Sequence, residues 1–379
     1  MIDLKFWDTK EKFLLLEVLP RRTAAYFLTV NEEHHLKVDT VKHAIGAKEL
    51  ATYLQMHRAK QNIIVAAHSS LVVTSILPVH IERTNRNEAL TTIELENLLS
   101  KAIGQIFNQC RSSASEDLGV DDLDTILVNS QVVQFKIDSH QVLNPAGFKA
   151  KTIEAIVELT LTTRQVFERL KVLLKSHKTF FFTESGRSEL ASLRKIFPLP
   201  LTLVNLNTEH SMAFVMKKAA VGHQVERKNM VWRSTSFAER LSEAFAIYPK
   251  VAVEMYDTYL QGTLSPHSKK YLGKLIDPDI QSLLAELKLG RFKGTIYIDC
   301  DRQLPFSFPL KTRYYTLVGP PLEALLQATG LTITESEWQV PREQILRHLA
   351  PFLEFYFRKN ESHVNQWLKR HLNWLGASV

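Results

Sequence analysis

The sequence has few cysteines and no long apolar run. Its only two cysteines, Cys110 and Cys300, lie in no CxxC pattern and have no histidine at metal-ligand spacing. A disulfide-stabilised secreted protein and a zinc finger are therefore excluded, and we expect two core thiols in a reducing cytoplasm. No stretch reaches the roughly 18 apolar residues of a spanning helix. The apolar run near the start covers only residues 13–16, so it predicts no signal peptide.

Several catalytic and binding signatures are also missing. There is no Walker loop and no RNA-binding aromatic signature, and His68-Ser69-Ser70 lacks the glycines of a nucleophile elbow. The acidic and histidine run at 32–35 falls between a predicted hairpin and a helix, where polar turn residues are expected, so we predict no metal site. Lysine and arginine exceed aspartate and glutamate by 47 − 40 = 7, and the pI is about 9.2. This excess favours an anionic partner, either nucleic acid or an acidic membrane surface, without choosing between them. Because the nucleic-acid-binding signatures are missing, we expect no nucleic acid partner.

The 379 residues predict two domains or one bilobed body. Two β-rich runs at 12–18 and 23–30 predict a hairpin, and a second hairpin is predicted from 201–206 and 211–221. Apolar residues at helical spacing predict a helix over 91–110, followed by a polar loop at 111–122. Strands and helices alternate in two halves that each contain a hairpin, and this order predicts a mixed α/β fold.

Residues 128–160 carry the most specific internal pattern: a strand, a turn, the tetrapeptide Asn-Pro-Ala-Gly at 144–147 and a further strand. This segment and the order of elements resemble the actin-like cell division protein FtsA. The resemblance covers about residues 10–335, and the pilus-assembly homologue PilM shares most of the layout. It implies an actin-like (ribonuclease H-like) two-lobed ATPase fold with an FtsA-type strand-helix-strand-strand insertion.

The resemblance also implies a division of the chain. The expected parts are a first lobe at 1–78 and 178–199, an inserted subdomain at 79–177, a second lobe at 200–340 with a helical part at about 235–290, a C-terminal helix and short linker at 341–361, and an amphipathic helix at 362–379.

In the family, two glycine-rich turns hold the phosphates of ATP with Mg²⁺, and a glycine pair admits adenosine. Glycines allow backbone N–H groups to approach phosphate oxygens closely. Here Leu19 stands in place of a glycine, and Pro20 has no N–H to donate. The eight positions that the resemblance assigns to the nucleotide are Glu17, Leu19, Thr23, Asn205, Asn207, Thr208, Cys300 and Asp301. Since all three loops have lost their glycines, we predict a pseudo-ATPase with no cofactor, no catalytic residue and no metal ligand.

The last 18 residues predict an amphipathic helix. At 100° per residue its large apolar side chains fall on one arc, as in helices that lie on a membrane surface, and membrane-anchored FtsA proteins end in a similar helix. The residues expected to contact the membrane are Val364, Trp367, Leu368, Lys369, Arg370, Leu372, Trp374 and Leu375. The alternative is that this helix docks on its own protein, because only residues 358–362 separate it from the preceding predicted helix.

Together these features predict an FtsA-like adaptor at the cytoplasmic face of the membrane, bound peripherally. The resemblance implies an FtsZ-like tubulin homologue as partner, self-association into filaments or oligomers, and contacts with other division proteins. Two alternatives remain open. One is a PilM-like scaffold of a pilus or envelope machine, and the other is a true ATP-dependent actin-like protein with unusual loops.

Overall fold

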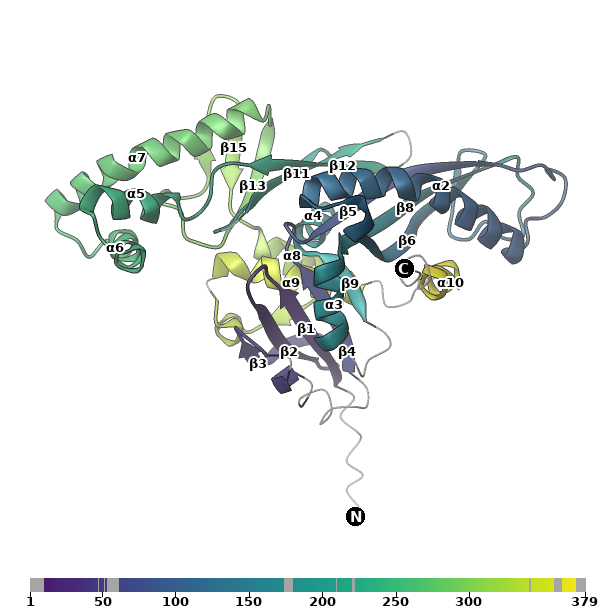
Figure 1. Cartoon of the computed structure of the whole chain (residues 1–379), viewed down its shortest axis with the longest axis horizontal. Helices are drawn as coiled ribbons and strands as arrows, with labels where there is room; N and C mark the ends of the chain where they lie inside the picture. Colours follow the sequence, from purple (N-terminus) through teal and green to yellow (C-terminus); the bar gives the residue numbers. More distant parts are fainter. Residues whose placement is uncertain are drawn as a thin grey trace, which may run out of the picture.

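The computed structural model describes residues 10–46, 48–50, 52, 61–173, 180–208, 210–219, 222–340, 342–357 and 363–372. The strands among these residues form three sheets, two of six strands and one of four. Figure 1 shows one six-stranded sheet at the bottom of the molecule, the second above it, and the four-stranded sheet at one side. The predicted mixed α/β class is confirmed.

Lobe I is built on the first sheet, whose strand order is β16-β3-β2-β1-β4-β9. Phe13 and Leu15 of its central strand β1 point to one core, and Leu14 and Leu16 point to another, because successive side chains alternate across a strand. The predicted hairpin is β1 with β2, paired antiparallel, and β4 and β9 continue the sheet in parallel. The strands are β1 (Glu11–Val18), β2 (Thr23–Val30), β3 (His35–Lys42), β4 (Gln61–Ala67), β9 (Phe181–Glu184) and β16 (Thr332–Ile333).

Lobe II repeats this arrangement in the order β12-β11-β10-β13-β15-β14. Strands β10 and β11 form an antiparallel hairpin, and β13 and β15 follow in parallel, so that β10 corresponds to β1 and β13 to β4. The strands are β10 (Leu201–Leu206), β11 (Ser211–Lys218), β12 (His223–Met230), β13 (Gly294–Cys300), β14 (Leu310–Lys311) and β15 (Tyr315–Val318).

The inserted subdomain is a four-stranded antiparallel sheet, β5-β8-β6-β7, with one long helix on its face. Its elements are β5 (Val72–Glu82), α2 (Thr92–Leu118), β6 (Thr125–Ile137), β7 (His140–Val142) and β8 (Thr152–Thr163), with a short 3₁₀ helix at Asp122–Asp124. The order strand, helix, strand, strand agrees with the prediction, with β7 as an additional short strand.

Four predicted boundaries shift in the structure. The inserted sheet begins at Val72 because β5 pairs with β8 along its whole length. Helix α3 (Arg164–Leu173) belongs to lobe I, since Val166 and Leu170 pack into the core of that lobe. The loop predicted at 111–122 is helical up to Leu118, because Ala114 is buried in the subdomain core. Strand β16 pairs with β3, so the chain returns to lobe I before residue 340.

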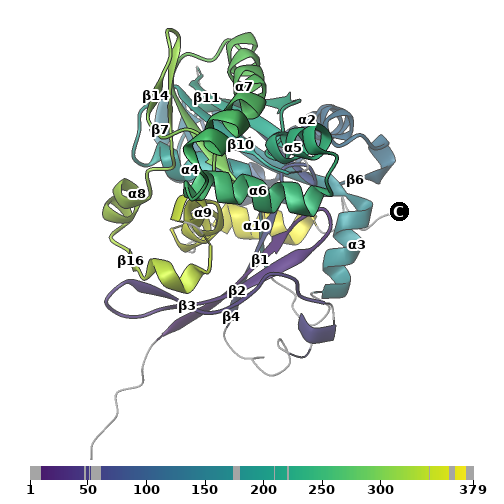
Figure 2. The ribbon, with the colours of Figure 1, turned by 90° about the vertical axis from the view of Figure 1, so that its left-hand side faces the viewer.

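Helices α4 (Ser185–Arg194), α8 (Leu322–Thr329) and α9 (Ile345–Tyr356) share one apolar core with facing sides of both sheets. In Figure 2, α8 and α9 lie between the two sheets. The lobes approach each other closely at Gly186, where an added Cβ would lie 2.4 Å from the Phe214 ring. The two lobes therefore form one packed body around α4 and α9, and this body positions the cleft described below.

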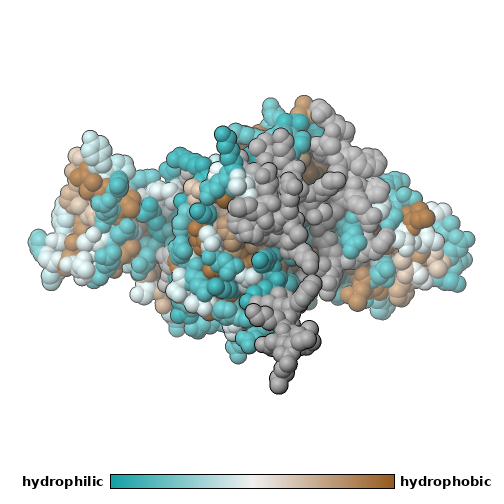
Figure 3. Space-filling model, turned by 90° about the horizontal axis from the view of Figure 1, so that it is seen from below, coloured by the Kyte–Doolittle hydropathy of each residue, from teal (hydrophilic) through white to brown (hydrophobic). Residues whose placement is uncertain are grey.

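Lobe II also carries α5 (Ser236–Phe245), α6 (Pro249–Gln261) and α7 (Pro266–Leu289), which lie at one end of the molecule, away from the inserted subdomain (Figure 1). The face seen in Figure 3 is mainly hydrophilic, with small apolar patches toward both ends. No helix among the described residues is both long enough and apolar enough to cross a membrane.

Candidate functional site: the cleft between the lobes

A cavity of about 770 Å³ opens where the β1–β2 turn of lobe I faces the β10–β11 turn of lobe II. Five of the eight predicted nucleotide positions line it: Glu17, Leu19, Asn207, Thr208 and Asp301. The other lining residues come mainly from the β1–β2 turn, from α6 and from α9. The predicted loop positions of the two lobes therefore meet at this one cavity.

Polar groups of the β1–β2 turn form hydrogen bonds within the chain. The Leu19 amide donates a hydrogen bond to the Arg22 carbonyl at 2.9 Å, which closes the turn. Arg169 of α3 donates to the Leu19 carbonyl at 3.3 Å and to the Thr23 hydroxyl at 2.7 Å. Pro20 has no N–H group. Thr23 is therefore a partner of Arg169 and lies outside the cavity lining.

Two backbone amides of the β10–β11 turn also form hydrogen bonds within the chain. The Asn207 amide donates to the Ser211 hydroxyl at 3.1 Å, and the Thr208 amide donates to Asp301 Oδ2 at 2.8 Å. The backbone donors that would hold a phosphate in this turn already have acceptors within the protein. Position 209 lies outside the described residues.

Two side chains of α9, Arg347 and His348, line the cleft. Arg347 Nε donates to Asp299 Oδ2 at 2.6 Å, and its guanidinium forms an ion pair with the same carboxylate. His348 Nδ1 lies 3.3 Å from Glu17 Oε2, and its ring packs against Tyr26 with ring centroids 4.9 Å apart. Glu17, the one acid retained in the first turn, is thus paired with a side chain of the same chain.

Burial sets the electrostatics of this cluster. Burial raises the pKa of Asp299, and it raises that of Glu189 on α4 further because Asp299 is close. Burial alone would also raise the pKa of Glu17, but the adjacent His348 and Arg347 lower it to about 2. The surrounding carboxylates, led by Asp299, raise the pKa of Arg347 against the effect of its burial, so this guanidinium stays charged.

The residues present do not fit Mg²⁺ and a triphosphate. The amides of Leu19, Asn207 and Thr208 have internal acceptors, Asp299 is paired with Arg347, and Glu17 lies beside His348. The described residues include no cluster of acids, histidines and cysteines that could hold a metal ion. Asn205 lies behind the cavity wall and donates to Glu189 at 3.1 Å. Cys300 packs against the core of lobe II, where burial raises the pKa of its thiol. We therefore derive no chemical step through a nucleotide.

Sequence reasoning missed the two α9 side chains and Glu189. The available signal was the polar pair Arg347-His348 inside the apolar stripe of a predicted helix. Such a pair on a buried face indicates acidic partners elsewhere in the fold. The identity of those partners required the three-dimensional packing of α9 against both lobes.

The predicted tail helix is observed as α10 (His363–Leu372), and it docks on the inserted subdomain. Val364 and Leu368 are 5% and 2% exposed in the subdomain core, and Trp367 packs at its margin. Lys369, Arg370 and Leu372 lie in α10, but their side chains are outside the described part of the structure. The predicted membrane contacts at Trp374 and Leu375 are also outside the described residues.

No protein-family model matches the chain, and no curated protein matches it in sequence. Among solved structures, a chain of the PilM-PilN type IV pilus biogenesis complex is 12% identical, with 95% of this chain and 98% of that chain covered and a TM-score of 0.48. A Bacteroides thetaiotaomicron protein with an actin-like ATPase fold and unknown function is 9% identical, with 89% and 95% covered and a TM-score of 0.35. The ethanolamine utilization protein EutJ from Carboxydothermus hydrogenoformans is 9% identical, with 91% and 89% covered and a TM-score of 0.34.

The fold is actin-like. This assignment rests on the repeated strand order β3-β2-β1-β4-β9 and β12-β11-β10-β13-β15 and on the cleft between the two equivalent hairpin turns. The predicted fold class is therefore confirmed.

We expect acid to destabilise the protein through His68, which lines the cleft. Burial, assisted by the charge of Arg347, lowers the pKa of His68 to about 4. The unfolded chain takes up this proton near its ordinary value of about 6.5, while the folded protein resists it until about pH 4. Stability is therefore lost as the pH falls from about 6.5 to 4, by roughly 2–3 kcal/mol.

Urea titration at pH 7 and at pH 4.5 measures this loss. His68→Asn should show a smaller loss than the natural protein, since asparagine does not titrate. His80→Asn, at an exposed position, should behave as the natural protein does. An equal loss in the natural protein and in His68→Asn would contradict the assignment.

Proposed function

We propose that the protein is a non-hydrolysing adaptor of the actin-like fold. In this proposal it tethers an FtsZ-type filament, or another assembly partner, at the cytoplasmic face of the membrane. The observation that carries the non-hydrolysing part is the pairing of Arg347 with Asp299 inside the cleft, together with the pairing of His348 with Glu17. Asp299 and Glu17 thus already have partners within the chain, and so do the amides of Leu19, Asn207 and Thr208.

The tethering part is supported by the amphipathic tail sequence. Burying six large apolar side chains halfway in a membrane surface contributes roughly 6–9 kcal/mol. Ordering about a dozen residues costs a comparable amount, at about 1 kcal/mol for each residue. One tail therefore binds weakly, and several tails on one oligomer bind firmly because each further contact is intramolecular. An adaptor that self-associates on a filament suits such a tail.

Calorimetric titration with Mg-ATP tests the non-hydrolysing part. We expect no saturable binding at micromolar concentrations and phosphate release no faster than in Glu17→Gln. Micromolar affinity, or turnover that is lost in Glu17→Gln, would establish the ATP-dependent alternative.

A second candidate is a PilM-like scaffold, in which α10 is a fixed part of the body. The burial of Val364 and Leu368 against the inserted subdomain favours it. Co-sedimentation with FtsZ and anionic vesicles, with and without residues 362–379, separates the two candidates. A membrane-tethering adaptor should bind vesicles, and the deletion should abolish this binding. A PilM-like scaffold does not need to bind vesicles with or without the deletion.

A further inference from the structure

Strand β6 has a free edge next to α10. Its inner edge pairs with β8, and on its outer edge β7 pairs only with the segment from Phe135 to Ile137. Within the described residues no strand pairs with the outer edge over 125–134. An unpaired strand edge presents N–H and C=O groups that need partners.

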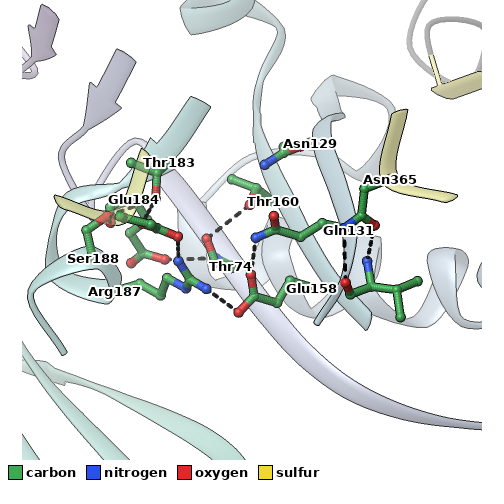
Figure 4. Close-up of polar contacts among 12 residues, drawn as sticks. Thr74, Asn129, Gln131, Glu158, Thr160, Thr183, Glu184, Arg187, Ser188 and Asn365 are labelled. Atoms are coloured by element: carbon green, nitrogen blue, oxygen red, sulfur yellow. Dashed lines mark hydrogen bonds and ion pairs between the residues drawn. The ribbon is translucent and has the colours of Figure 1, made fainter. Parts of the chain in front are cut away.

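Asn365 of α10 forms hydrogen bonds with the backbone N–H and C=O groups of Val132 on this edge. Its side-chain Oδ1 accepts a hydrogen bond from the Val132 amide at 2.8 Å, and its Nδ2 donates to the Val132 carbonyl at 3.1 Å. A residue in an antiparallel partner strand makes this same pair of bonds in a hydrogen-bonded pair. The carboxamide of Asn365 thus takes the place of a missing strand, and Figure 4 shows it facing β6 at one end of a polar network.

Docking uses part of the surface predicted to bind the membrane. Val364 and Leu368 lie one helical turn apart, and both are buried beside β6 with Trp367 at the margin. On a vesicle the same side chains would face the lipid. The helix can therefore serve only one of these two surfaces at a time.

We propose that α10 is an autoinhibitory latch, in which docking on the β6 edge withholds the tail from an anionic membrane. This inference rests on the tethering role proposed above. Asn365 is the residue that separates the two states, because its carboxamide bonds to β6 and it is not one of the predicted membrane contacts. A substitution there weakens docking and leaves the apolar stripe intact.

The full-length protein with Asn365→Ser tests the latch. Serine keeps the position polar but cannot make both bonds to Val132. Loss of these bonds should raise the apparent affinity for vesicles of phosphatidylglycerol and phosphatidylethanolamine about tenfold. Gln366→Ser, at the neighbouring exposed position, is the matched control and should bind as the natural protein does. Hydrogen exchange of the 126–135 segment reports docking directly, and vesicles should remove its protection.

The outcomes separate the latch from the tether. Equal vesicle binding by the natural protein and Asn365→Ser, or binding with β6 protection kept, overturns the latch while the tether stands. If neither protein binds anionic vesicles although Asn365→Ser has lost β6 protection, the membrane role itself is overturned, and the latch falls with it.

Discussion

Replacement of Arg347 by alanine is expected to lower the free energy of unfolding at pH 8 by about 3–5 kcal/mol, the usual cost of breaking a buried ion pair. Asp299 is fully buried, and Arg347 is its cationic partner. Glu189 is equally buried and close enough to Asp299 for its pKa to be raised by that charge. Without the guanidinium, two buried acids lose the positive charge that compensates them.

The penalty should shrink as the pH falls. Burial already raises the pKa of Asp299 in the natural protein, and removal of Arg347 raises it further. A carboxyl whose folded pKa lies above its unfolded value contributes stability at low pH and loses it as the pH rises. The difference between Arg347→Ala and the natural protein should therefore be larger at pH 8 than at pH 5, as measured by urea titration.

Arg22→Ala is the control for this experiment. Arg22 also lines the cleft, but its side chain is exposed, so its removal should change stability by about 0.5 kcal/mol or less. A penalty in Arg347→Ala of the same small size, or one that does not depend on pH, would show that Arg347 does not compensate the buried acids.

The order of the elements could be predicted from the sequence because the strands of both hairpins are short β-rich runs separated by turn residues, a pattern that is visible locally. The β1–β2 and β10–β11 runs carry their own turn residues, and their side chains alternate between two cores. The subdomain boundary could not be predicted, because β5 joins its sheet through pairing with β8, about 80 residues later. Local periodicity contains no information on such a pairing.

For a similar reason, the turn residues of the site could be predicted from the sequence, whereas its helix residues could not. The residues of the turns, such as Leu19 and Asn207, follow from the position of each turn in the sequence, and they line the cavity as expected. Arg347 and Glu189 belong to helices, and they reach the same cluster only because α9 and α4 pack between the lobes. The buried side of α10 likewise depends on where the free edge of β6 lies.

Replacement of Arg187 by alanine is expected to destabilise the protein by about 3–5 kcal/mol. Arg187 of α4 forms an ion pair with Glu158 of β8, as Figure 4 shows, and a second ion pair with Glu354 of α9. All three side chains are almost fully buried. The arginine joins the inserted subdomain to the helix that precedes the tail, so its loss leaves two buried negative charges at that junction.

A triple variant separates charge compensation from packing at this junction. Arg187→Met combined with Glu158→Gln and Glu354→Gln removes every charge. Gln131 can still donate to residue 158, and Thr183 and Ser188 can still donate to residue 354. We expect this variant to recover stability to within about 1–2 kcal/mol of the natural protein, because a neutral, well-packed replacement of a buried ion pair costs little.

Chemical denaturation of the single and triple variants measures both effects, and Arg164→Ala serves as the surface control. The exposed ion pair of Arg164 with Asp124, at 3.5 Å, should contribute less than about 1 kcal/mol. Equal destabilisation of Arg187→Ala and the triple variant would mean that the shape of Arg187, and not its charge, holds the subdomain on α9. Recovery in the triple variant would instead mean that the cost in Arg187→Ala comes from the two carboxylates left without a positive partner, and not from lost packing.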